Sequence, residues 1–126
     1  MVARVSITML AAVALIALAL SAAAAAKGPQ VRVTGACTKS SHSKLKLSQD
    51  NSRIDVEFEV DQNVNGVRWN VTLSRAGTVL FNGTRTTRGP SGSFELRRFV
   101  SDMAGADRIT AKATRAGETC RATATI

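Results

Sequence analysis

The sequence has few of the side chains from which most catalytic, metal-binding and base-stacking sites are built. Its 126 residues include no tyrosine, one tryptophan, four phenylalanines and one histidine. Zinc needs three or four ligands, and nucleic-acid binding uses exposed aromatic rings that stack on bases. The histidine, His42, lies among loop serines, and its spacing from them and from Asp50 does not favour a catalytic triad. We therefore expect no enzyme activity, no cofactor, no zinc site and no nucleic-acid partner.

The only long apolar run lies near the N-terminus. Arg4 precedes an apolar run from Ile7 to Leu20, and the small residues Ala22–Ala26 follow it. The run is short for a membrane span, which needs about 20 residues, and a small-residue pattern before Lys27 is typical of signal-peptidase cleavage. No cysteine lies at that site, which argues against a lipid anchor. The sequence predicts a cleaved signal peptide over residues 1–26 and a secreted or cell-wall-associated product without a transmembrane span.

The predicted mature chain, residues 27–126, has the length of one domain. Removing the leader removes Arg4 alone, and it lowers the formal charge from +8 to +7. The two cysteines, Cys37 and Cys120, fall on the apolar faces of their segments. An even cysteine count in an exported chain favours a disulfide, which would join the two ends of the domain. Two buried free thiols or a redox pair are the alternatives.

The strongest pattern in the chain runs from Ser52 to Leu73. Apolar side chains alternate with polar ones from Ile54 to Val60 and again from Val67 to Leu73, and a turn ending in Asn65-Gly66 separates the two stretches. Alternation on both sides of an Asn-Gly turn is typical of a β-hairpin. We therefore expect these two strands to pair with each other.

The rest of the mature chain repeats this alternation with a turn signal roughly every ten residues. We expect Trp69 in the core, Val79 and Phe81 facing inward, a bulge at Gly83 and an irregularity at Arg97-Arg98. The pattern predicts an all-β, two-sheet antiparallel sandwich of about seven or eight strands. Further strands are expected at residues 30–37, 43–48, 78–88, 93–100, 107–115 and 119–126.

Two sets of residues resemble known proteins. Trp69, followed by a late strand Asp107-x-Ile109-x-Ala111-x-Ala113, resembles an immunoglobulin-like or fibronectin type III sandwich. Three segments resemble small exported proteins of actinobacteria: Glu57–Asn63 (EFEVDQN), Asn65–Val71 (NGVRWNV) and Pro90–Leu96 (PSGSFEL). The first resemblance implies the architecture, and the second implies export without implying a reaction.

One segment has the pattern of a metal-binding loop. Asp61, Asn63 and Asn65 match the first half of a calcium loop, which ends in a bidentate glutamate at its twelfth position. That position here is Thr72, inside a predicted strand, so a polar hairpin turn is the favoured interpretation and calcium the alternative.

The basic residues are spread over many strands. A positive surface attracts polyanions, and we name Lys44, Lys46, Arg97 and Arg98 as candidate contacts with an anionic cell-wall polymer; a protein partner and solubility alone are the alternatives. The outward acids Asp55, Glu57 and Glu59 are expected to pair with basic residues on neighbouring strands. The sequence thus favours a non-enzymatic secreted domain that interacts at the cell envelope. The alternative is a small protease inhibitor that uses the loop Arg88–Gly92.

Overall fold

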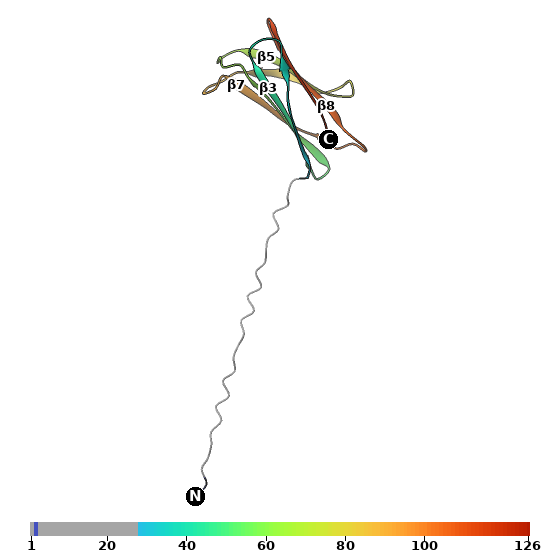
Figure 1. Cartoon of the computed structure of the whole chain (residues 1–126). Coiled ribbons are helices and arrows are strands. Elements are labelled where there is room, and N and C mark those ends of the chain that lie inside the picture. The colour runs from blue at the N-terminus through green and yellow to red at the C-terminus, as the bar shows by residue number, and fades with distance from the viewer. Residues whose placement is uncertain (1, 3–27) are drawn as a thin grey trace.

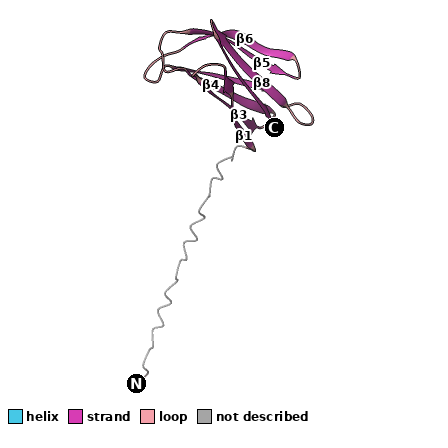
Figure 2. Cartoon of the chain, turned by 45° about the horizontal axis from the view of Figure 1, so that its top comes forward, coloured by secondary structure: helices cyan, strands magenta, loops and turns pink. Residues whose placement is uncertain are grey.

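The computed structural model describes Val2 and residues 28–126, and the latter form two antiparallel β-sheets that pack face to face (Figure 1). One sheet has the strand order β1-β3-β4-β7 and the other β2-β9-β8-β5-β6. Figure 2 shows β5, β6 and β8 in one layer and β1, β3 and β4 in the other. The strands are β1 (Gln30–Thr34), β2 (Ala36–Cys37), β3 (His42–Asp50), β4 (Arg53–Asp61), β5 (Arg68–Arg75), β6 (Thr78–Thr86), β7 (Ser93–Ser101), β8 (Arg108–Arg115) and β9 (Glu118–Thr125).

The structure contains no helix in the described part of the chain, and hence none that could cross a membrane. The predicted signal peptide, apart from Val2, lies outside the described residues. The prediction of seven or eight strands becomes nine because the expected first strand is divided into β1 and β2.

The core lies between the two sheets, where every second side chain of each central strand points inward. Trp69 is completely buried, lies 6.1 Å from the ring of Phe94 and donates its indole N–H to Gln62 over 3.0 Å. Each large apolar side chain buried in this way contributes about 2 kcal/mol before entropy is subtracted. The other fully buried large side chains include Leu45, Leu47, Ile54, Val56, Phe58, Val60, Val71, Leu73, Leu96 and Ile109.

The predicted hairpin between β4 and β5 is wrong, although both strands exist. β4 pairs with β3 and β7, whereas β5 pairs with β6 and β8 in the other sheet. The connection between them is bonded to the segment before β7: Gly66 N–H donates to Thr87 O, and Thr87 N–H donates to Val67 O. Alternation shows that a strand has one buried face, but it does not show which strand lies beside it.

The predicted bulge in β6 lies three residues earlier than expected, at Leu80. Gly83 stays in register with Val71, and the register shifts where Leu80 is skipped, between Phe81 and Val79. This extra residue turns Val79 outward, where 59% of it is exposed, so its predicted inward position is wrong. No irregularity occurs at Arg97-Arg98, because β7 keeps its register with β4 throughout.

The chain changes sheet at Gly35, between β1 and β2. A Cβ atom at this position would lie 2.1 Å from Ser43 Oγ and 2.9 Å from the backbone oxygen of Arg121, so the crossing requires glycine. Two residues later, Cys37 forms a disulfide with Cys120, its register partner on β9, 83 residues along the chain. The predicted disulfide is therefore confirmed, and it ties the start of the sandwich to its last strand.

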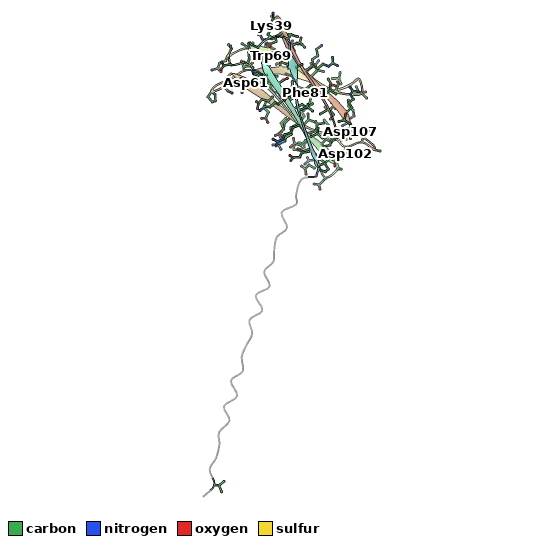
Figure 3. All side chains as sticks on the ribbon, in the orientation of Figure 1. Lys39, Asp61, Trp69, Phe81, Asp102 and Asp107 are labelled. Atoms are coloured by element: carbon green, nitrogen blue, oxygen red, sulfur yellow. A yellow bond between two sulfur atoms is a disulfide. The ribbon has the colours of Figure 1, made fainter. Side chains whose placement is uncertain are left out.

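The antiparallel strands give the sandwich two ends with different contents. We call the end that carries residues 38–41, 62–67, 87–92 and 116–117 the distal end, because both described termini lie at the opposite, terminal end. At the terminal end, the backbone of Gly28 is hydrogen-bonded to that of Gln49, and the backbone of Ile126 is hydrogen-bonded to that of Asp107. Figure 3 shows Lys39 at the distal end and Asp102 and Asp107 at the terminal end.

Candidate polyanion-binding surface

The outer surface of β9, β8, β5 and β6 is a polar sheet face that we call the basic face. Its side chains point outward because their strand neighbours, such as Trp69, Ala111 and Ala122, are buried in the core. The face consists of Arg68, Asn70, Thr72, Ser74, Val79, Asn82, Thr84, Thr86, Arg108, Thr110, Lys112, Thr114, Thr119, Arg121, Thr123 and Thr125.

The basic face carries four cations and no carboxylate: its charged members are Arg68, Arg108, Lys112 and Arg121. None of them lies within 4.0 Å of a carboxylate among the described residues. A surface of one sign without internal neutralisation attracts oppositely charged polymers. This face is therefore the strongest candidate contact surface of the domain.

Two of these cations are direct neighbours. Lys112 on β8 is the register partner of Arg121 on β9, and both side chains are exposed. Like charges directly opposite each other destabilise a sheet by up to about 1 kcal/mol relative to opposite charges. The pair is therefore an unfavourable arrangement for the free domain, and an anion bound between the two would relieve the repulsion.

The outer face of the four-stranded sheet shows the opposite arrangement. Lys44 lies 3.6 Å from Glu59 and Lys46 lies 2.7 Å from Glu57, in both cases across the β3–β4 register. The predicted cross-strand pairing of the outward acids is thus confirmed. Three of the four predicted polyanion contacts (Lys44, Lys46 and Arg97) are neutralised by acids on this face.

The strongest of these ion pairs joins Arg97 to Asp55. The guanidinium donates from Nε over 3.0 Å and from a terminal nitrogen over 2.6 Å, and the Asp55 side chain is completely buried. The hydrogen bond to Asp55 and the attraction of its charge raise the pKa of Arg97. Arg53 and Arg97 also stack on the half-exposed ring of Phe99, at 4.2 and 5.4 Å.

The fourth predicted contact, Arg98, lies at the open edge of the sandwich. Its guanidinium is 4.8 Å from the centre of the Phe81 ring on β6, and Arg85 approaches the same ring at 5.4 Å. The four predicted contacts therefore divide between the neutralised face and this edge, and none of them belongs to the basic face.

The calcium candidate residues occupy the distal end. Asp61 accepts a hydrogen bond from the backbone N–H of Asn63 over 3.1 Å, and Asn63 adopts a positive φ of 60°. This is the geometry of an Asx turn, so one carboxylate oxygen already has a partner. Asn65 lies farther along the loop, beside Gly89.

His42 also lies at the distal end, as the register partner of Asp61. Asp50 lies at the other end of the same strand, β3. Since a strand rises about 3.3 Å per residue, the two side chains cannot meet, and a triad built from His42 and Asp50 is excluded.

The Arg88–Gly92 segment forms a closed turn. The carbonyl oxygen of Arg88 accepts bonds from the N–H groups of Gly92 and Ser93, and Arg88 N–H donates to Ser93 O. A protease inhibitor presents an extended loop whose backbone groups are free to pair with the enzyme. The backbone of Arg88 is already occupied inside the domain, so this loop offers little support for the inhibitor alternative.

Sequence reasoning missed a buried carboxylate at the distal end, Glu118. It accepts a hydrogen bond from the Ser41 hydroxyl over 2.7 Å and lies 2.9 Å from Arg115, whose guanidinium stacks 5.5 Å from the Trp69 ring. The oxygen and sulfur atoms of Glu118, Cys37 and Cys120 lie within 4.8 Å of one another, but the sulfurs are joined in the disulfide. The signal was available, since Glu118 has the inward parity of Cys120 on β9.

Another buried carboxylate, Asp107, lies at the terminal end. It is 1% exposed and lies 3.1 Å from Nε of Arg75. Interaction with Asp107 raises the pKa of the neighbouring Asp102, burial raises it further, and the charge of Arg75 opposes both effects. This end therefore holds two neighbouring carboxyl groups and one arginine.

No protein-family model, curated protein or solved structure matches this chain.

Proposed function

We propose that the chain is an exported, non-enzymatic domain of immunoglobulin-like architecture that binds an anionic polymer of the cell envelope through its basic face. The observation that carries the proposal is the contrast between the two outer faces. On the outer face of the four-stranded sheet, Lys44, Lys46 and Arg97 each form an ion pair with an acid of β4, whereas the basic face has four cations and no acid.

The strand order supports the architecture. If β3, β4, β5, β6, β7, β8 and β9 are taken as strands A, B, C, C′, E, F and G, the sheets read A-B-E and G-F-C-C′. In immunoglobulin-like domains strands A, B and E likewise lie in one sheet and strands G, F and C in the other. β1 and β2 are then additions at the outer edges of strands A and G.

Export is supported by two observations. The N-terminal sequence has the three regions of a signal peptide, and the two cysteines are joined in a disulfide, a bond that persists in oxidising compartments. Outside the cell, a domain of charge +7 meets anionic wall polymers and lipid headgroups.

The test is retention on isolated cell wall. The full chain is expressed with its leader, and mass spectrometry of the exported product shows whether cleavage occurs before Lys27. The product is then sedimented with cell wall from the source organism at low and high salt. We expect retention at low salt and release at high salt, because salt screens contacts between exposed charges.

Charge reversal locates the contact. The double variant K112E/R121E should lose retention, whereas R32E/K39E should keep most of it. The control changes the net charge equally, but Arg32 lies on the outer face of the four-stranded sheet and Lys39 in a distal loop. Equal loss in both variants would mean that net charge alone, and not the basic face, determines binding.

A further inference from the structure

We infer that the basic face selects a phosphodiester polymer that carries no bases, and that Lys112, Arg121 and the threonines around them hold its phosphates. This inference rests on the proposed function and names the chemistry of the ligand at the same surface. It follows from the order of side chains across the sheet.

The register places the cation pair between two rows of hydroxyl groups. Thr119 and Thr114 face each other on one side of Arg121 and Lys112, and Thr123 and Thr110 face each other on the other side. Thr72 follows Lys112 in its own row, on β5. Strands are about 4.8 Å apart, and alternate residues about 6.8 Å, so each cation has hydroxyls near enough for one bound anion to contact the cation and a neighbouring hydroxyl.

These hydroxyls retain capacity for a ligand. Thr110 and Thr123 are 2.9 Å apart, so one hydroxyl donates to the other, and the hydrogen of the accepting hydroxyl stays available. The Thr114 and Thr119 hydroxyls make no hydrogen bond within the described part of the chain. Since the face has no carboxylate to compete for them, each cation and its neighbouring hydroxyls can donate together to a bound anion.

The arrangement suits a phosphate better than a carboxylate. A phosphodiester is tetrahedral and can accept from donors that lie along a strand and across strands at once, and lysine is a common point-charge ligand of phosphate. On the outer face of the four-stranded sheet, a carboxylate is bound by one planar guanidinium: Arg97 donates hydrogen bonds to both oxygens of Asp55. At the basic face the guanidinium of Arg121 is joined by Lys112 and by the hydroxyl rows, and a planar carboxylate would leave some of these donors unused.

The basic face also lacks any aromatic side chain. Proteins that bind single-stranded nucleic acids stack bases on aromatic rings, and none is present between the threonine rows. The preferred polymer is therefore a base-free chain of polyol units joined by phosphodiesters.

The experiment measures binding of the exported protein to three polymers at one salt concentration: poly(glycerol phosphate), poly-L-glutamate of the same number of charges, and single-stranded DNA. We expect the tightest binding to poly(glycerol phosphate). K112Q/R121Q should reduce the slope of log affinity against log salt by about two, and R32Q/K39Q should leave it nearly unchanged.

A threonine variant separates hydroxyl recognition from charge. T110V/T123V keeps every charge and the β-branched shape of the side chains, and it should weaken binding to poly(glycerol phosphate) by about tenfold. Binding to poly-L-glutamate should stay the same. An equal loss for both polymers, or a loss for neither, would overturn the role of the hydroxyl rows.

The remaining outcomes separate this inference from the proposed function. If poly-L-glutamate binds as tightly as poly(glycerol phosphate), the face recognises charge without phosphate preference, and only the inference fails. If DNA binds more tightly than poly(glycerol phosphate), the preference for a base-free polymer is wrong. If none of the polymers binds the protein and the protein is not retained on cell wall, the proposed function fails as well.

Discussion

Ser41 and Glu118, 77 residues apart in the chain, are joined by two hydrogen bonds that connect the loop after β2 to the first residue of β9. The Ser41 hydroxyl donates to one carboxylate oxygen over 2.7 Å, and its backbone N–H donates to the other over 3.1 Å. Arg115 completes the set from the neighbouring strand, 2.9 Å away. This buried network fixes one loop of the distal end against the β8–β9 turn.

Replacing Glu118 with alanine should therefore destabilise the domain strongly. The change leaves the Ser41 donors and the Arg115 charge without their partner, and breaking a buried polar network of this kind costs about 2–4 kcal/mol. Urea unfolding of E118A and wild type measures the difference. E95A is the matched control, because Glu95 is exposed on β7 and its loss should cost under about 0.5 kcal/mol. Equal stability of E118A and wild type would contradict the structural role of the network.

Glu118 should also make the stability of the domain depend on pH in the acid range. Burial alone would raise the pKa of Glu118, but the hydrogen bonds from Ser41 and Arg115 outweigh it and lower the pKa below its ordinary 4.5. A lowered folded-state pKa gives stability that is present above pH 4.5 and is lost as the pH falls through the folded value. E118Q should therefore show a flatter fall in urea midpoint below that pH. A fall as steep as in the wild type would show that Glu118 does not lose a stabilising charge there.

Asp102 should give the opposite dependence of stability on pH. Interaction with Asp107, together with burial, raises its pKa above the ordinary 3.8, so its favourable contribution is present below that pH and is lost as the pH rises through the folded value. D102N removes the charge that is repelled by Asp107 at neutral pH. We expect a higher urea midpoint than wild type at pH 7 and no gain at pH 3. E95Q, which neutralises an exposed acid away from Asp107, should show no such pH-dependent gain.

Removing the disulfide should cost about 4 kcal/mol in the chain-entropy model, because the bond closes a loop between residues 83 apart. C37A/C120A should unfold at a correspondingly lower urea concentration. A reducing agent should lower the midpoint of the wild type to near that of the variant, and it should not change the variant. If the reducing agent has no effect on the wild type, the bond contributes little to stability.

Much of the fold could be predicted because alternation is a local signal. The strands, the inward position of Trp69 and the pairing of Cys37 with Cys120 all follow from which residues share a face. The partner of each strand could not be predicted in this way. β4 and β5 have the alternation and the turn of a hairpin, yet they face each other across the core, because both bury the same kind of apolar face.

The basic face could not be predicted for the same reason: the sequence does not show which strands pair. Lys112 and Arg121 are visible in the sequence as outward cations, but their juxtaposition depends on the register of β8 with β9. Lys44 and Lys46 look equivalent to them in the sequence, and only the β3–β4 register shows that acids neutralise them. Charge counts describe a whole domain, whereas pairing decides which charges stay available.

Both described termini emerge from one end of the sandwich, as Figure 2 shows for β1 and the C-terminus. A linker attached to either of these ends would therefore lie at the terminal end of the sandwich. The loops that contain Ser41 and Arg88 would point away from the linker, and the threonine rows would lie on a lateral face of the domain. Ligand binding to either surface could then be measured on an immobilised protein without steric interference from the linker.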